Sequence, residues 1–254
     1  MEIARVAHSN DNEAGLGEQA LSKVAEVGLS SQLKEVESMD VDIRTNPLQL
    51  IQGNLDSVTI RGEGMVMQKN LRVEDMEIET GSISVNPLSI AFGKIELTHP
   101  TDAKARIVLT EDDINRSFNS EYILGKLQNI QVQVDGQPMT VDTKRVEFRI
   151  PDNERVAISA DIYVHETGET KHTSFTTRLQ RSSDGERISL DDVQYTEGEA
   201  LSPELTAALL EKANELGNLR NFELDGMSLR LRNVDLQGDR MTLQTDIHIE
   251  EFPQ

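Results

Sequence analysis

The chain has 254 residues, enough to bury one sizeable core or two small ones. It contains no cysteine, which excludes disulfides, cysteine nucleophiles and zinc sites built from thiolates. Its 45 acidic and 25 basic side chains give a formal net charge of −20. This charge disfavours nucleic acid and a bare anionic bilayer as partners, so any membrane contact is expected to come from apolar surface.

The sequence shows neither an export signal nor a membrane-spanning run. It does not open on a basic stretch followed by a long apolar one, and no apolar run exceeds four residues. We therefore expect a cytoplasmic protein with transient membrane association. Residues 1–13 are predicted to be a flexible N-terminal segment, and residues 14–254 a single domain.

An amphipathic helix is predicted over residues 14–37. Leu16, Val24 and Val27 recur at helical spacing and form an apolar stripe, and Leu21 lies beside it. Charged side chains occupy most of the remaining positions. One face of this helix should therefore pack against another element of the fold.

From Val41 onward apolar and polar residues alternate, as is typical of strands with one buried face. Turn signals separate further alternating runs as far as the C-terminus, which predicts an antiparallel meander. Between Leu71 and Ile78 the alternation slips by one residue, and this slip predicts a β-bulge near Glu74 or Asp75.

Two more helices are indicated by their capping signals. The first follows Thr110, whose hydroxyl precedes three acidic residues, and it carries the apolar side chains of Ile114 and Phe118 before resuming through Ile123 and Leu127. The second starts at Ser202-Pro203. Its apolar face is formed by Leu205, Leu209 and Leu216.

One motif occurs twice. Asn46-Pro-Leu-x-Leu-x-x-Gly53 recurs forty residues later as Asn86-Pro-Leu-x-Ile-x-x-Gly93, and alternating strands flank each copy. The copies could be similar loops that cap the sheet. Alternatively they form apolar lips at a groove mouth or membrane-touching tips. The side chains concerned are Leu48, Leu50, Ile51, Leu88, Ile90 and Phe92.

No motif in the sequence points to catalysis or to a cofactor. The glycine pattern in residues 15–20 resembles a dinucleotide fingerprint, but no strand leads into it. The five histidines lack a second ligand at helical spacing, so no metal site is predicted. Neighbouring acidic residues point apart, and there is no nucleophile elbow or P-loop. We predict no catalytic residues and a non-enzymatic protein.

Five blocks of sequence carry a resemblance to a known family: Val41–Gly53, Leu71–Leu97, Leu109–Phe118, Leu201–Leu210 and Phe222–Pro253. Together they resemble the LmeA-like phospholipid-binding family, and especially its cyanobacterial-type members. The resemblance implies a tubular lipid-binding (TULIP-like) fold, in which a long twisted sheet rolls around a helix, and phospholipid binding without catalysis. It supplies no catalytic residues, so the candidate site comes from the apolar pattern alone.

The predicted fold is α+β and β-rich, with a long, strongly twisted antiparallel meander wrapped around amphipathic helices. The predicted function is non-catalytic binding of phospholipid or another acyl lipid in an apolar groove. Burial stabilises such a complex by about 0.8 kcal/mol per methylene, so head-group selectivity should be weak. The predicted lining is Leu16, Leu21, Val24, Val27, Leu48, Leu50, Leu88, Ile90, Phe92, Ile114, Phe118, Ile123, Leu127, Leu205, Leu209 and Leu216.

A second hypothesis is a protein-interaction module with a filled core, whose acidic surface docks a basic partner. The two hypotheses differ in what they predict for the interior. Lipid binding requires a continuous apolar cavity beneath the first helix, whereas the interaction module requires none.

Overall fold

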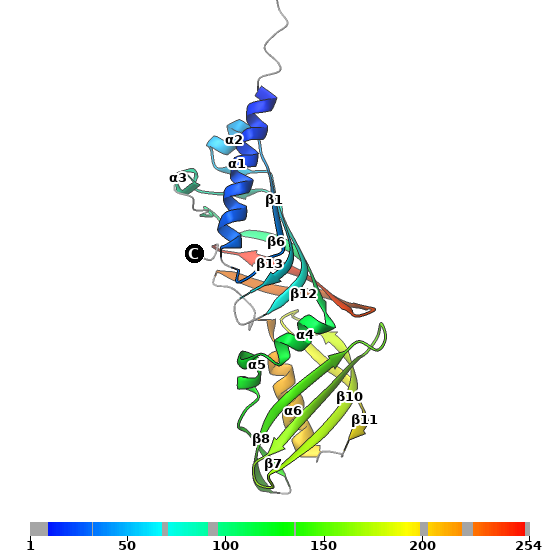
Figure 1. The fold of residues 1–254 in the computed structure, drawn as a ribbon. Helices are drawn as coiled ribbons and strands as arrows, with labels where there is room; N and C mark the ends of the chain where they lie inside the picture. The colour runs from blue at the N-terminus through cyan, green and yellow to red at the C-terminus, as the bar shows by residue number, and fades with distance from the viewer. Residues whose placement is uncertain are drawn as a thin grey trace, which may run out of the picture.

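Two antiparallel β-sheets, each with its own helices, follow one another along an elongated molecule in a computed structural model of the protein (Figure 1). The structure describes residues 10–31, 33–67, 71–90, 96–134, 136–198, 203–219 and 226–251. The β-rich α+β architecture expected from the alternating pattern is confirmed, with all but two short strands divided between these two sheets.

The first sheet joins the beginning and the end of the chain. Its six strands lie in the order β1-β3-β4-β6-β13-β12, and all neighbours are antiparallel. The strands are β1 (Ser38–Arg44), β3 (Ser57–Val66), β4 (Arg72–Thr80), β6 (Thr101–Thr110), β13 (Arg240–Ile249) and β12 (Met227–Gln237). The C-terminal hairpin of β12 and β13 returns to pair with β6, so this sheet is not a meander throughout.

The second sheet is a plain meander whose strands lie in sequence order. It consists of β7 (Ile130–Val134), β8 (Gln137–Arg149), β9 (Val156–Val164), β10 (Glu169–Arg181) and β11 (Ile188–Gly198). Its helices are α4 (Glu111–Phe118), α5 (Glu121–Lys126) and α6 (Pro203–Leu216). Their apolar side chains and the inner face of the sheet form a closely packed core.

The capping signals place these helices well. The Thr110 hydroxyl accepts a hydrogen bond from the Asp113 N–H at 3.1 Å, and the Asp113 carboxylate accepts one from the Thr110 N–H at 3.0 Å. This reciprocal capping box fixes the start of α4 where the sequence predicts it. The predicted start of α6 at Pro203 is likewise confirmed.

The first helix, α1 (Asn10–Ser30), ends earlier than predicted. The chain beyond Ser30 leaves the helix and adds to the edge of β3, where the Lys34 N–H donates to the Val66 carbonyl at 2.9 Å and Glu35 forms a bridge with Val66. The extension of the helix to residue 37 is therefore wrong. Gly28, Ser30 and Ser31 weaken the end of the helix, and tertiary pairing with β3 outweighs the helical preference of the residues that follow.

The predicted β-bulge in β4 is also wrong, because β4 pairs with β3 and β6 without a register shift. The irregularity lies in the neighbouring strand, where Gly64 has a φ of 57° and the next two residues, Met65 and Val66, are both buried. A left-handed glycine changes the local alternation of side chains at no steric cost. In β4 itself the apolar pattern slips without an extra residue, because its pairing with both neighbours keeps one register.

Candidate functional site

A continuous apolar face crosses the first sheet from edge to edge. Residues directly opposite each other on paired strands point to the same side of a sheet. One such row contains Val41, Ile60, Ile78, Ala105, Thr245 and Leu231. The next row contains Ile43, Val58, Thr80, Ala103, Ile247 and Leu229, and the Val58 N–H donates to the Thr80 hydroxyl where the β3–β4 pairing ends. We call these twelve residues, contributed by both ends of the chain, the apolar sheet face.

Helix α1 covers only one edge of this face. It packs on β1, where Ala25 is buried in a cluster with Val41 and Ile43. Away from this edge Ile60, Ile78 and Leu229 are partly buried, whereas most other members of the face are buried. On the helix itself Val24 is 43% and Val27 64% exposed. Helix α1 and the strands β3 and β4 therefore each keep some apolar side-chain surface exposed.

Two threonines interrupt the apolar sheet face. The Thr80 hydroxyl donates to the Gly81 carbonyl at 2.9 Å. The Thr245 side chain is 2% exposed, and its hydroxyl has no hydrogen-bond partner within the described parts of the chain. A buried hydroxyl without a partner is unfavourable by about 1–3 kcal/mol. Such a group is a candidate contact for an acceptor atom of a bound molecule.

The first copy of the repeated motif and the described part of the second, residues 86–90, form neighbouring turns at the end of the sheet that carries α1. Each contains a short helix, α2 (Pro47–Ile51) and α3 (Pro87–Ile90), and the adjoining strands β2 (Asn54–Leu55) and β5 (Ile83–Ser84) pair with each other. Leu48 is 74%, Ile51 75% and Leu88 73% exposed. These apolar side chains therefore lie on the outside of the fold.

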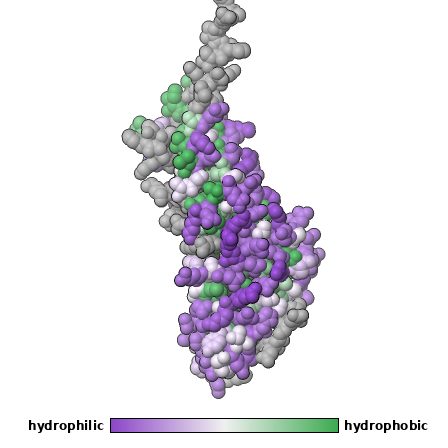
Figure 2. All heavy atoms as spheres, in the orientation of Figure 1, coloured by the Kyte–Doolittle hydropathy of each residue, from purple (hydrophilic) through white to green (hydrophobic). Residues whose placement is uncertain are grey.

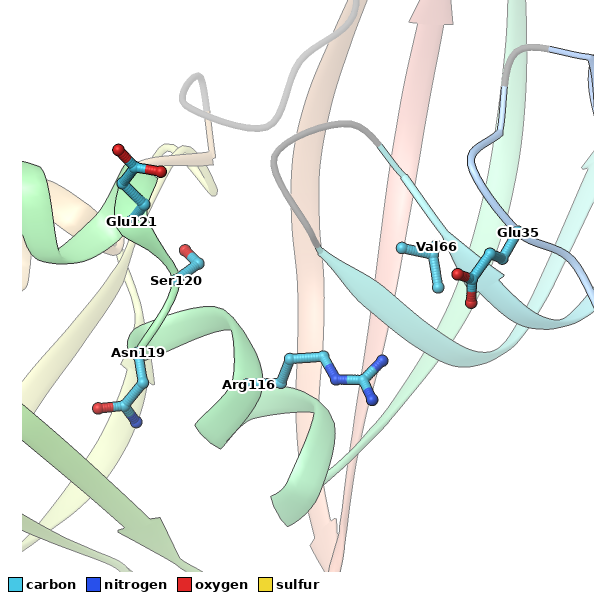
Figure 3. Close-up of a pocket in the computed structure, with 6 residues that line it drawn as sticks. All are labelled: Glu35, Val66, Arg116, Asn119, Ser120 and Glu121. Carbon is cyan, nitrogen blue, oxygen red and sulfur yellow. The ribbon is translucent and has the colours of Figure 1, made fainter.

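A cavity of about 420 Å³ lies where the two sheets meet, but its lining is polar. It is lined by Glu35, Val66, Arg116, Asn119, Ser120 and Glu121. In Figure 3 the Arg116 side chain extends toward Glu35 and Val66, and Asn119 and Ser120 lie beyond it at the junction of α4 and α5. With a single apolar side chain, this cavity does not suit an acyl chain.

The residues predicted to line one groove fall in three separate places. Leu21 packs against the α1 cluster, with Val24 and Val27 exposed beside it. Leu48 and Leu88 are exposed on the repeat turns, and Leu50 is partly buried there. The others belong to the cores around the second sheet: Ile114, Phe118, Ile123, Leu127, Leu205, Leu209 and Leu216.

Three of the predicted residues cannot be placed. The side chains of Leu16 and Ile90, and all of Phe92, lie outside the described residues. Sequence reasoning missed the apolar sheet face as a site, although it predicted several of the strands that form it. The alternation of apolar and polar residues indicates which side chains share a face within one strand. It does not indicate that strands from the two ends of the chain pair with one another.

The described residues include no group of three or more histidine and carboxylate side chains that could hold a metal ion. Instead, three histidines each contact one aspartate: His165–Asp142 at 3.0 Å, His172–Asp161 at 2.8 Å and His248–Asp102 at 2.7 Å. No helix within the described ranges is long and apolar enough to cross a membrane.

Fold and site together define a β-rich α+β protein whose first sheet presents an apolar face that its own helix covers in part. A sequence profile of the LmeA-like phospholipid-binding family matches residues 13–246, nearly the whole chain. The protein belongs to this family, as the resemblance of its sequence blocks predicted.

Two further comparisons add little. No curated protein sequence matches the chain. Among solved structures, the crystal structure of lipopolysaccharide binding protein aligns over 92% of this chain and 95% of that one, at 10% identity. The TM-score of this alignment is 0.19, too low to support an argument about the fold.

Proposed function

We propose that the protein binds phospholipid without catalysis and holds the acyl chains against the apolar sheet face, beside α1. Membership of a phospholipid-binding family supports the choice of ligand. The observation that carries the location is the partial cover of this face: α1 packs on β1, and Ile60, Ile78 and Leu229 remain partly exposed. Transient contact with a membrane, from the cytoplasmic side, is part of the proposal.

The dimensions of the face suit an extended hydrocarbon chain. Six strands about 4.8 Å apart give a face roughly 24 Å across. Each methylene removed from water there contributes about 0.8 kcal/mol, so a long acyl chain can bind without any charged group to hold its head. The Thr245 hydroxyl, buried and without a partner within the described residues, could donate to an ester carbonyl of the lipid.

The predicted lining residues take different parts in this proposal. Leu21, Val24 and Val27 of α1 border the bound chains. The residues in the cores around the second sheet can contact lipid only if the helices of that sheet move away from it, because they now pack against protein side chains. Those residues are Ile114, Phe118, Ile123, Leu127, Leu205, Leu209 and Leu216.

Native mass spectrometry of the purified protein tests the proposal. We expect phospholipid to co-purify, and the double variant Ile60→Thr/Ile78→Thr to retain much less of it. The matched control is Ile158→Thr, which alters a partly buried isoleucine of β9 in the second sheet and should leave lipid retention unchanged. Thr245→Val, which removes the hydroxyl and keeps the shape, should lower retention without destabilising the lipid-free protein.

The proposal fails if the protein yields no lipid on extraction with organic solvent and does not retain added phospholipid. The interaction module would then be favoured. Two observations support that alternative: the filled core of the second sheet and the net charge of −20. It predicts capture of basic partners that weakens as salt concentration rises.

A further inference from the structure

The two repeat turns form one surface without charge. We define the repeat tip as residues 46–55 and 83–90, which contain α2, β2, β5 and α3. Neither segment contains a charged residue, although 28% of the chain is charged and its net charge is −20. The repeat tip therefore differs in composition from the rest of this acidic protein.

Hydrogen bonds join the two turns into one unit. Besides the β2–β5 pairing, the Val85 N–H donates to the Gly53 carbonyl at 2.7 Å, and the Ser84 hydroxyl donates to the Asn54 side chain at 2.8 Å. The start of each short helix is capped, because Asn46 accepts from the Gln49 N–H. The Asn86 side chain likewise accepts from the Leu88 N–H, and the donor–acceptor distance is 3.0 Å in both hydrogen bonds.

The apolar side chains of the repeat tip divide into an inner and an outer set. Leu55, Ile83 and Val85 are buried in the cluster that contains Ala25 of α1, and they hold the tip on the fold. Leu48, Ile51 and Leu88 point outward and are each about three-quarters exposed. Figure 2 shows apolar surface near α1 at this end, whereas most of the visible surface is hydrophilic. Such a patch marks an interaction site.

We propose that the repeat tip docks on the surface of a zwitterionic phospholipid bilayer, with Leu48, Ile51 and Leu88 inserted among the lipids. This inference rests on the proposed function, because the tip belongs to the same apolar cluster as Val41 and Ile43 of the apolar sheet face. The tip would thereby hold the end of the sheet that carries α1 against the bilayer. The side-chain caps satisfy N–H groups that insertion would otherwise leave unpaired.

The charge distribution selects the kind of bilayer. The acidic body repels an anionic surface, and the tip offers no basic residue to offset that repulsion. Binding should therefore depend on apolar insertion, decrease as anionic lipid is added, and not weaken as salt concentration rises. A polybasic anchor would show the opposite dependence on both.

Flotation with phosphatidylcholine vesicles tests this proposal. The wild type should float with the vesicles, and Leu48→Ser/Ile51→Ser/Leu88→Ser should lower the bound fraction at least tenfold. The matched control is Tyr195→Ser, which removes a 52% exposed side chain from the other sheet and should change nothing. The single variants should each lower binding in part, which keeps the test valid if the triple variant fails to fold.

The outcomes separate docking from lipid carriage. A triple variant that still carries lipid by native mass spectrometry but no longer floats supports the repeat tip as the docking element. A wild type that carries lipid but does not float overturns this inference and leaves the proposed function standing. A dimeric wild type that the same substitutions make monomeric overturns it too, because the tip would then bind a second copy. If the wild type neither floats nor carries lipid, both fail.

Discussion

Arg72 of β4 connects three parts of the chain. Its guanidinium lies 2.7 Å from the Asp113 carboxylate of α4, 2.8 Å from Glu74 and 3.0 Å from Glu37. The hydrogen bond to Asp113 is the largest of the contacts that raise the pKa of Arg72. The Asp113 side chain is only 3% exposed, and Arg72 is the cation that pairs with it at 2.7 Å.

We expect Arg72→Met to lower the free energy of unfolding by about 3 kcal/mol, because it leaves the Asp113 carboxylate buried without its cation. Arg61→Met is the control. Arg61 contacts Glu77 at 2.8 Å but is 52% exposed, and an exposed ion pair contributes about 1 kcal/mol or less. Urea unfolding measures both variants, and equal losses would contradict this account.

Asp142 gives the protein a defined acid sensitivity. Its carboxylate accepts the Asn129 N–H at 2.9 Å, which lowers its pKa below the ordinary 3.8, and Lys144 and His165 act in the same direction. Because the pKa is lower in the folded state, the ionised group stabilises the fold above pH 3.8, and this stabilisation is lost as pH falls through the folded-state pKa.

The variant Asp142→Asn should therefore be less stable than the wild type by about 1.5 kcal/mol at pH 7. The difference should shrink below pH 3.8 and vanish once the wild-type carboxylate is protonated. Unfolding in urea across this pH range measures it. A difference that stays constant down to pH 2 would show that the charge of Asp142 plays no part.

Among the elements, the joined repeat turns depend on one glycine. Gly53 has a φ of 76°, and a Cβ atom there would lie 2.1 Å from the Val85 carbonyl oxygen. Gly168, in the turn between β9 and β10, has a similar φ of 71° but open space around it. The two positions separate the cost of the backbone conformation from the cost of the close approach.

Gly168→Ala should cost about 1 kcal/mol of stability from the left-handed backbone alone. Gly53→Ala should cost about 3 kcal/mol, because the methyl group also pushes the two repeat turns apart. Thermal unfolding gives both values. If the two substitutions lower the free energy of unfolding equally, the close approach of Gly53 to the Val85 carbonyl does not contribute to stability.

The sequence predicted the presence of helices and strands better than the residues at which they end. Local signals sufficed where a cap or a turn is formed within the segment, as at Thr110 and Pro203. They failed at residues 31–37, where pairing with β3 competes with the helix, and in β4, where the pairing shows no bulge and the left-handed residue is Gly64 of β3. Both errors come from partners that are distant in sequence.

At the scale of the whole molecule, one apolar cluster joins the two sheets. It contains Phe148 and Val156 of the second sheet together with Leu231 and Leu243 of the first, and Ile114 of α4 lies with them. A shared core of this kind makes separate unfolding of the sheets unfavourable. The cluster supports the proposal that residues 14–254 form a single domain.

Leu231→Ala tests it. Leu231 is 1% exposed and lies in the first sheet, whereas all three tyrosines of the chain, Tyr122, Tyr163 and Tyr195, lie in or beside the second. The substitution should cost about 3 kcal/mol and lower the midpoints of the tyrosine fluorescence and far-ultraviolet circular dichroism transitions together. An unchanged tyrosine transition would mean that the sheets unfold independently.

The sequence by itself determined the β-rich α+β class, the helix starts at Thr110 and Pro203, the charge-free repeats and the family. These follow from the periodicity of apolar residues, helix-capping residues, composition and blocks of sequence that resemble the family in the same order. All of these are properties of the local sequence. Only the tertiary structure decided that Ile60 and Ile247 share one apolar face and that α1 covers one edge of it. Strand register between distant segments and the cover given by a helix arise from long-range packing, which local patterns do not encode.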